Sequence, residues 1–384
     1  MKYIELKDIN EYKSESINPA KMQETIFELY SVPVYETGHP EYLTGKEIAS
    51  SKIVVRKNDI LLCKINPRIN RVWIVRKESE NINIASSEWI VVRNNKYNPE
   101  FLAWYFRSPK FRQLMVSEVT GIGGSLTRAQ PKRVAKYPVP IMDRIIQDKI
   151  VYRLNRIQKI IDMKKKELIK LDLLIQSRFV EMFGDPIIND KEWNTWRLEE
   201  VCKKIVDCPH STPSYTTENT GFMCIRTSIV KKNKILWDDI EYISEDEFIK
   251  RTQRKKPEIG DIVYTREGAI LGIAAIIDRE YNVALGQRAM LLSPNHDKCV
   301  SEFLCVAMNR DSFLNNVLKG ISGSASPHIN VGDIRNFKMI IPPINLQNQF
   351  AAFVQQVNKS KFEVQKSLEK TQLLFDSLMQ EYFG

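Results

Sequence analysis

The chain has 384 residues, which is more than one hydrophobic core usually holds, so we expect two or more domains. Hydrophobic residues make up 43% and charged residues 27%, as in ordinary folded proteins, and the net charge of +10 favours a polyanionic partner. The first residues form no apolar signal region and no run of 18 apolar residues occurs, so we expect no membrane segment and a cytoplasmic protein. Six cysteines without a Cys-x-x-Cys pair argue against zinc and for free thiols.

The first 144 residues are predicted to form a globular segment built on short strands. Its apolar runs are rich in β-branched residues and are separated by Gly, Asn and Pro; they cover residues 53–55, 60–62, 72–75 and 89–92. A short helix is predicted from Pro99 to Glu118. A Gly/Ser loop and the proline-marked strand at 137–140 then lead to the next segment.

Residues 145–184 are predicted to form one long helix. Apolar residues recur in steps of three and four from Ile150 to Met182, and only Lys164 and Arg178 interrupt them. Such spacing gives a narrow apolar seam that packs on a partner helix.

The rest of the chain repeats this order, with a globular segment at 185–345 and a second long helix at 346–384. Strands are predicted at 261–264, 274–277 and 289–292, and a short helix from Ser301 to Leu318. Residues 147–184 and 347–384 align without a gap at an offset of 200, with eleven identities in 38 positions. Self-similarity of this kind indicates a repeated structural unit, and two matched helices most simply pack on each other.

Common catalytic signatures are missing from the sequence. There is no phosphate-binding Gly-x-x-x-x-Gly-Lys-Ser/Thr loop, no dinucleotide fingerprint and no Asn/Asp-Pro-Pro-aromatic box of amino-methyltransferases. The four histidines are too scattered for a metal cluster. Asp59 and Asp261 precede strands at equivalent places, where we expect them to cap turns.

Polar loops dense in Arg, Asn, Ser, Thr and Gln follow equivalent strands in both halves. Arg pairs with guanine and Asn or Gln with adenine, while Ser, Thr and backbone amides bind phosphate. The candidate DNA-contacting residues are Lys64, Asn66, Arg68, Asn70, Arg71, Ser87, Gly124, Ser125 and Arg128 in the first half, and His210, Ser211, Thr212, Arg226, Thr227, Ser228, Arg266, Gln287, Arg288 and His328 in the second. Plain solvated surface is an equally good interpretation of these loops. The basic cluster 251–256 is expected to touch phosphate non-specifically or to touch nothing.

With these residues in view, the chain resembles the specificity subunit of type I restriction-modification enzymes. The resemblance covers nearly the whole length, and its most specific segments are 64–73 (Lys-Ile-Asn-Pro-Arg-Ile-Asn-Arg-Val-Trp), 207–213 (Asp-Cys-Pro-His-Ser-Thr-Pro), 260–268, 285–288 and the endings Glu-Met-Phe-Gly at 181–184 and Glu-Tyr-Phe-Gly at 381–384. The family's Pro-Pro-x-x-x-Gln start of each helix is present at 342–347, whereas the first copy lacks the second proline after Pro140.

The resemblance implies an α+β fold in which two small target-recognition domains are separated and joined by two long antiparallel coiled-coil helices, as a pseudo-two-fold repeat. Each domain would read one half of a bipartite, asymmetric site in double-stranded DNA, and the helices would set the gap. Catalysis would lie in other chains: two methyltransferase subunits that bind S-adenosylmethionine and methylate adenine, and motor-nuclease restriction subunits that cut. No catalytic residue, cofactor or metal is therefore expected in this chain.

Partner docking and two other functions remain to be considered. The outer helix faces, including Arg153, Arg156 and Lys165, are candidates for docking the methyltransferase subunits, although a solvated face is equally plausible. A self-sufficient DNA methyltransferase is a second possibility, against which the missing box argues. A stand-alone DNA-binding regulator without enzyme partners is a third.

Overall fold

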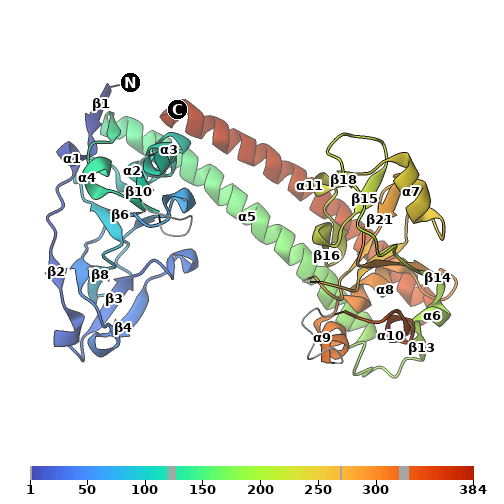
Figure 1. The fold of residues 1–384 in the computed structure, drawn as a ribbon. Helices are drawn as coiled ribbons and strands as arrows, with labels where there is room; N and C mark the ends of the chain where they lie inside the picture. The colour runs from blue at the N-terminus through green and yellow to red at the C-terminus, as the bar shows by residue number, and fades with distance from the viewer. Residues whose placement is uncertain (1, 118, 121–126, 269, 320–327) are drawn as a thin grey trace. The chain divides into compact units, whose positions relative to one another are not determined.

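The computed structural model describes residues 2–117, 119–120, 127–268, 270–319 and 328–384, and forms two compact units (Figure 1). Unit 1 comprises Met1–Lys165 and Ser367–Gly384, and unit 2 comprises Lys166–Lys366. The two long helices, α5 (Arg144–Phe183) and α11 (Ile344–Phe383), each contribute one end to each unit. Of the helices in the described ranges, none combines the length and apolar character that crossing a bilayer requires.

The globular part of unit 1 is built on a three-stranded and a five-stranded sheet. The antiparallel three-stranded sheet has the order β7-β6-β9, from β7 (Val72–Ile74), β6 (Ile60–Cys63) and β9 (Trp89–Val92). The second sheet has the order β2-β5-β8-β3-β4, from β2 (Ser16–Ile17), β5 (Lys52–Val54), β8 (Ile82–Ala85), β3 (Ile26–Tyr30) and β4 (Glu41–Thr44). Around them lie β1 (Lys2–Glu5) paired with β12 (Pro138–Ile141), β10 (Val119–Thr120) paired with β11 (Arg128–Ala129), α1 (Leu6–Ile9), α2 (Pro99–Arg107), α3 (Pro109–Ser117) and α4 (Pro131–Val134).

Unit 2 repeats the central part of this plan. Its main sheet has the order β14-β22-β19-β20, from β14 (Cys202–Asp207), β22 (Ala289–Pro294), β19 (Ile262–Thr265) and β20 (Ala274–Ile276). The remaining strands form the sheet β18-β15-β21, from β18 (Glu241–Tyr242), β15 (Met223–Ile225) and β21 (Val283–Leu285), the hairpin of β16 (Val230–Lys231) and β17 (Lys234–Ile235), and the pair of β13 (Thr195–Arg197) and β23 (Lys338–Ile340). The helices are α6 (Leu198–Val201), α7 (Glu245–Thr252), α8 (Ser301–Met308), α9 (Asp311–Lys319) and α10 (Val331–Arg335). Single 3-10 turns lie at Pro19–Lys21, Tyr35–Thr37, Gly45–Glu47, Pro67–Ile69, Thr227–Ile229 and Trp237–Asp239.

The duplication is visible in individual hydrogen bonds before the central strands β6 and β19. The Asp59 carboxylate accepts from the backbone N–H of Arg56 at 2.8 Å, and the Asp261 carboxylate accepts from that of Glu258 at 2.9 Å. Both carboxylates therefore cap a turn, which confirms the role predicted for them. The residue before each aspartate has a positive φ, 72° at Asn58 and 89° at Gly260, and Asn and Gly are the residues that tolerate this conformation best.

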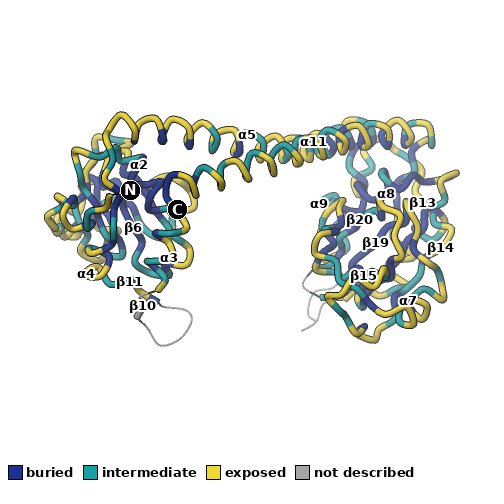
Figure 2. The backbone as a smooth tube through the Cα atoms, turned by 90° about the horizontal axis from the view of Figure 1, so that it is seen from above, coloured by how far each residue is buried: buried dark blue, intermediate teal, exposed yellow. Residues whose placement is uncertain are grey.

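The long helices pack antiparallel within each unit. In unit 1, Ile150 and Leu154 of α5 share a buried cluster with Tyr382 and Phe383 of α11. In unit 2, the C-terminal turns of α5 and the N-terminal turns of α11 meet instead, through Phe179, Phe183, Phe350 and Val354. Figure 2 shows buried positions (dark blue) mainly where the helices join their globular parts. The predicted fold class, two α+β units with an antiparallel helix pair, is confirmed.

A buried glutamine fastens the start of each long helix. The amide oxygen of Gln147 accepts from the backbone N–H of Asn98 at 2.8 Å, and its nitrogen donates to the Met142 carbonyl at 2.8 Å. The amide oxygen of Gln347 accepts from the N–H of Val300 at 3.0 Å, and its nitrogen donates to the Pro342 carbonyl at 2.8 Å. Asn98 and Val300 precede α2 and α8, so both glutamines connect a long helix to a short one.

Each short helix expected before a long helix is in fact two helices. The predicted helix from Pro99 to Glu118 divides at Ser108, which is extended because proline follows it. The predicted helix from Ser301 to Leu318 divides after Met308, where the Asn309 side chain forms hydrogen bonds with both backbone groups of Ala274, at 3.0 and 2.8 Å.

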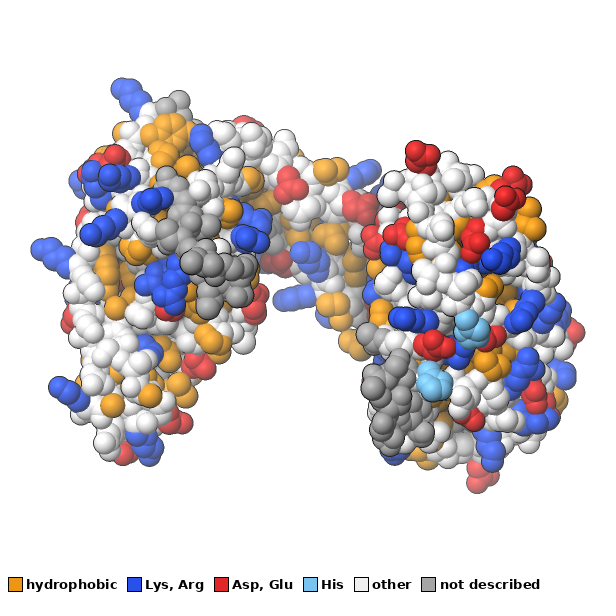
Figure 3. All heavy atoms as spheres, in the orientation of Figure 1, with side chains coloured by type: hydrophobic (Ala, Val, Ile, Leu, Met, Phe, Trp, Pro, Cys, Tyr) orange, Lys and Arg blue, Asp and Glu red, His pale blue; other side chains and the backbone are white. Residues whose placement is uncertain are grey.

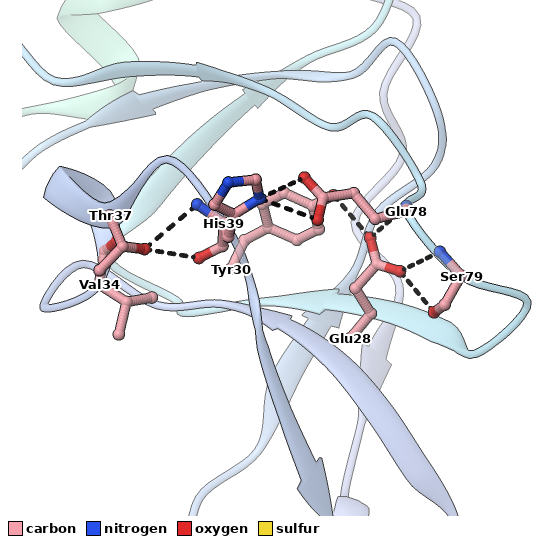
Figure 4. Close-up of polar contacts among 7 residues, drawn as sticks. All are labelled: Glu28, Tyr30, Val34, Thr37, His39, Glu78 and Ser79. Atoms are coloured by element: carbon pink, nitrogen blue, oxygen red, sulfur yellow. Dashed lines mark hydrogen bonds and ion pairs between the residues drawn. The ribbon is translucent and has the colours of Figure 1, made fainter.

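Unit 1 also contains a fully buried carboxylate, Glu28, at the centre of strand β3 (Figure 4). Its oxygens accept from the Tyr30 hydroxyl at 2.7 Å, from the Ser79 hydroxyl at 2.6 Å, and from the backbone N–H groups of Glu78 and Ser79 at 3.0 and 2.9 Å. Burial raises the pKa of this carboxyl, but the hydrogen bonds from Ser79 and Tyr30 outweigh it and lower the pKa below the usual value. Glu28 thereby secures the turn between β7 and β8.

Candidate nucleic-acid interface

Three segments of unit 1 meet at the end of strand β6. The backbone N–H of Lys64 donates to the Glu88 carbonyl at 3.1 Å, and the Lys64 carbonyl accepts from the N–H of Ala129 at 2.8 Å. The N–H of Asn66 donates to the Thr127 carbonyl at 2.9 Å. We call this meeting of residues 64–66, 86–88 and 127–129 the loop junction of unit 1.

Unit 2 has an equivalent loop junction at the end of strand β19, formed by residues 266–268, 286–288 and 328–329. The N–H of Arg266 donates to the Arg288 carbonyl at 3.0 Å, and the N–H of Ile329 donates to the Arg266 carbonyl at 2.9 Å. An isolated antiparallel β-bridge joins the backbones of Glu267 and His328, and an equivalent one joins Ile65 and Arg128. The two junctions therefore share main-chain hydrogen bonds but present different side chains.

The loop junction of unit 1 gathers four predicted residues: Lys64, Asn66, Ser87 and Arg128. Ser87 and Arg128 are exposed, and the Arg128 guanidinium lies 3.3 Å from the Glu88 carboxylate. Glu88, which was not among the predicted residues, therefore lies at the same junction.

Three further predicted residues of unit 1, Arg68, Asn70 and Arg71, lie in the loop between β6 and β7. Asn66 and Asn70 flank its 3-10 turn in the left-handed conformation, with φ of 46° and 50°. Arg68 is exposed at the tip, whereas Arg71 is half-buried and its Nε lies 3.8 Å from a Glu36 carboxylate oxygen. Gly124 and Ser125 lie outside the described residues.

Arg266 occupies a different environment from the one expected. It is 5% exposed, its Nε lies 3.0 Å from the Asp207 carboxylate, and its Nη2 lies 2.8 Å from that of Glu267. His210, which is exposed, lies 3.1 Å from the same Asp207 carboxylate. Two carboxylates hold this guanidinium within the unit, which gives Arg266 a positioning role, and its contact with DNA stays a prediction.

The segment 210–212 is held against the junction from two sides. The Thr212 hydroxyl donates to the Gln287 amide oxygen at 2.9 Å. Arg251 donates to the carbonyls of Ser211 and Leu285 at 2.5 and 3.2 Å, and to Glu247 at 2.6 Å. Arg251 is buried, so the expectation that it touches phosphate or nothing is wrong for this member of the basic cluster.

Residues 226–228 follow strand β15, which runs parallel to β21. The N–H of Gly286 donates to the Ile225 carbonyl at 2.9 Å, so Arg226 lies beside the residues that precede Gln287. Its guanidinium is half-buried and lies 3.1 Å from the Glu241 carboxylate. Thr227 is half-buried and Ser228 is exposed, so this segment forms the margin of the interface.

Arg288 is the candidate best placed for contact with DNA. It is exposed, and its guanidinium has no hydrogen bond or ion pair with any residue in the described ranges. Its φ of 73° is uncommon for a residue with a side chain. On the face drawn in Figure 3, Lys and Arg side chains are interspersed with acidic and neutral ones. Readout by individual residues therefore fits this surface better than a continuous basic patch.

The described residues offer little to a metal ion. They contain no group of three or more His, Cys, Asp or Glu side chains placed to hold one, and all six cysteines are free. Burial raises the pKa of the Cys202 and Cys224 thiols to about 12 each, so both remain protonated near neutral pH.

Comparisons with known proteins agree with this arrangement. The family model for the type I restriction modification DNA specificity domain matches residues 190–373. The type I restriction enzyme MjaVIII specificity subunit of Methanocaldococcus jannaschii is 20% identical over 346 residues, which cover 84% of this chain and 79% of the relative.

Two solved structures share the fold over the whole chain. The S subunit of a type I restriction-modification system from M. genitalium has a TM-score of 0.60 at 11% identity, and 96% of it is covered. A chain from a structural study of assembly and conformational transition in a type I system has a TM-score of 0.58 at 20% identity, and 97% of it is covered.

These findings favour neither a self-sufficient methyltransferase nor a stand-alone regulator, because the matched proteins are specificity subunits. A specificity subunit recognises DNA and assembles with the other subunits of its system without catalysing the reaction itself. Residues 190–373 thus match the DNA specificity domain of type I restriction-modification systems, and the function of the chain is to recognise DNA.

Proposed function

We propose that each unit reads one half of a bipartite, asymmetric DNA site through its loop junction. The observation that carries this proposal is the shared set of main-chain hydrogen bonds around Lys64 and Arg266. This shared backbone arrangement would orient the loops of each unit on DNA in the same way. The side chains differ, with exposed Ser87 and Arg128 in one unit and half-buried Gln287 beside exposed Arg288 and His328 in the other, so the two half-sites would differ in sequence.

Replacing Arg288 with alanine tests this proposal. We expect Arg288→Ala to relax base preference at one position of one half-site by about 1–3 kcal/mol, because an arginine–guanine pair would be lost. The measurement is competition binding of the full complex to DNA libraries randomised in each half-site separately. Arg128→Ala in unit 1 is the matched control, and its effect should appear in the other half-site. Equal losses in both half-sites for either variant would contradict the proposal.

The partner subunits would bind the exposed faces of the long helices. Of the eleven positions that α5 and α11 share, six lie on one stripe: Lys166, Lys170, Leu173, Leu174, Ser177 and Glu181, matched by Lys366, Lys370, Leu373, Leu374, Ser377 and Glu381. At 3.6 residues per turn they span about 100° of the helix surface. All twelve residues are exposed, so packing within the chain does not explain why they are the same in both copies. We call each set of six a recruitment stripe.

A surface that occurs twice indicates a partner that binds twice. Two copies of an adenine methyltransferase fit this requirement, each carrying S-adenosylmethionine and each docked on one recruitment stripe. We prefer the recruitment stripe to the face around Arg153 as the docking surface. The Arg153 guanidinium donates to the Tyr382 hydroxyl at 3.0 Å, and neither residue is found at the matching position of the other long helix. Motor-nuclease restriction subunits would complete the complex in the cytoplasm, where the DNA is accessible. Purification of the complex followed by mapping of methylated adenines would identify the site.

A further inference from the structure

Unit 2 contains a groove of about 1180 Å³ that is bounded by α5, α8, α11 and the β16–β17 hairpin. Its apolar lining includes Ile169 and Leu173 of α5, Ile276 of β20, and Ala351 and Ala352 of α11. Ile169 and Leu173 are 60% and 59% exposed, so this side of the groove presents apolar surface to solvent. Such a surface marks an interaction site, provided that an occupant can be identified.

The groove is open because unit 2 has small residues where unit 1 has large ones. Val306 and Ala352 line it in unit 2, and their counterparts in the duplicated sequence are Trp104 and Tyr152. In unit 1 the Trp104 indole is 8% exposed, donates to the Asn155 amide oxygen at 2.7 Å and packs edge-on against Phe375 at 5.5 Å. The two units therefore differ at this place, although their helices follow one pattern.

The charges around the groove neutralise one another. Lys361 pairs with Asp172, Lys232 lies 2.6 Å from Asp311, and the Arg310 guanidinium donates to the Gln176 amide at 2.8 Å. Glu302 accepts from the Gln355 amide at 2.8 Å. A neutral rim over an apolar floor does not attract a polyanion, even though the chain as a whole carries +10. The groove therefore fits a protein segment and not DNA.

The groove is continuous with the recruitment stripe, because Leu173 belongs to both. We infer that one helix of the methyltransferase docked at unit 2 enters this groove with an apolar ridge, as helices pack into grooves between neighbouring helices. This inference rests on the proposed function. In unit 1 the buried Trp104 occupies the corresponding place, and Ala352 is matched by the larger Tyr152, which is 64% exposed, so the methyltransferase docked there makes the stripe contact alone. The two copies of one partner thus bind the same chain with unequal affinity.

Filling the groove with the residue of the other unit tests the inference. Ala352→Tyr installs the counterpart of Tyr152, and Ile169→Glu installs the counterpart of Glu369. Both positions are exposed in the free chain, so neither change should unfold it. Tyr152→Ala in unit 1 is the matched control. The methyltransferase subunit of the same system is titrated into each full-length chain and followed by calorimetry and native mass spectrometry.

For the wild-type chain we expect two binding steps that differ at least tenfold in Kd. Each groove variant should weaken the tighter step at least tenfold and leave the weaker one unchanged, while Tyr152→Ala should change the tighter step less than twofold. Two equal sites in the wild type, or unchanged binding by both groove variants, would overturn the inference and leave the proposed function standing. A wild-type chain that binds no methyltransferase would instead overturn the proposed function.

Discussion

At the scale of single residues, Glu28 shows how a buried charge can hold a turn. Its carboxylate accepts four hydrogen bonds, two of them from the backbone of Glu78 and Ser79. Glu28→Gln would place an amide N–H₂ against some of these donors. We expect this variant to lower the free energy of unfolding by about 1–3 kcal/mol, because a buried donor loses its acceptor. Urea unfolding of the purified chain at neutral pH gives the measurement.

The same carboxylate should make stability depend on pH. Its folded-state pKa lies below the unfolded value, which is near 4.5. Glu28 therefore contributes stability that is fully present above the unfolded pKa and is lost as the pH falls through the folded pKa. Unfolding free energies measured between pH 6 and pH 3 should decline less steeply for Glu28→Gln than for the wild type. Parallel curves would assign the acid sensitivity to other groups.

Three arginines of unit 2 show that local sequence does not reveal which side chains are exposed. Arg251, Arg266 and Arg288 are alike in the sequence, yet the first two are buried and only Arg288 is exposed. Arg266 is held by Asp207, 59 positions away, and Arg251 by the Ser211 carbonyl, 40 positions away. Local sequence cannot reveal partners at such separations. The loops could be selected from the sequence, but the residues within them that face outward could not.

At the scale of elements, the two buried glutamines explain why Gln147 and Gln347 are identical in the two copies. Gln347→Leu would leave the backbone N–H of Val300 buried without its acceptor. We expect a loss of about 1–3 kcal/mol in the free energy of unfolding. Gln356→Leu, at an exposed position of the same helix, is the control and should change stability by less than about 0.5 kcal/mol. Thermal unfolding of both variants compares the two positions.

The recruitment stripes should be dispensable for DNA recognition and required for assembly. Leu173→Asp and Leu373→Asp each place a charge in one stripe, and the two leucines are 59% and 69% exposed. We expect each single variant to retain its fold and to lose one methyltransferase per chain, and the double variant to lose both. Native mass spectrometry counts the bound subunits. Full occupancy of the double variant would show that the stripes are solvated faces.

The long helices were the most predictable elements, because a three-and-four spacing over 40 residues has no other explanation. The seam was less predictable in detail. Phe179 and Phe183 turned out to be fully buried, yet the predicted seam passed through Met182. These phenylalanines face Phe303 of the globular part as well as Phe350 of the other helix, and spacing along one helix cannot show a second neighbour.

At the scale of the whole molecule, the net charge of +10 makes DNA affinity depend on salt. We expect the logarithm of the affinity for a cognate site to fall linearly with the logarithm of the salt concentration. Arg288→Ala should change this slope by less than about one unit while it reduces the preference for the correct base, because its role is readout and not phosphate neutralisation. Fluorescence anisotropy between 50 and 400 mM KCl separates these effects. A slope reduced in proportion to the affinity would make Arg288 a phosphate contact.

The repeat made the order of elements predictable from the sequence. It did not predict which strands the outer strands pair with. Strand β3 pairs in parallel with β8, more than 50 residues later, and unit 2 repeats this with β15 and β21. Both members of each pair are short, and short apolar runs do not specify which run they join. The pairing of the central strands is simpler, because β6 and β19 each pair with a strand that is near in sequence.

The loop junctions are fastened by main-chain hydrogen bonds around Lys64 and Arg266, and this has an evolutionary consequence. A backbone amide makes the same bond whichever side chain it carries. Point mutations at the exposed positions can therefore accumulate without unfolding the protein, and under the proposed function each new combination of side chains would recognise a different DNA sequence.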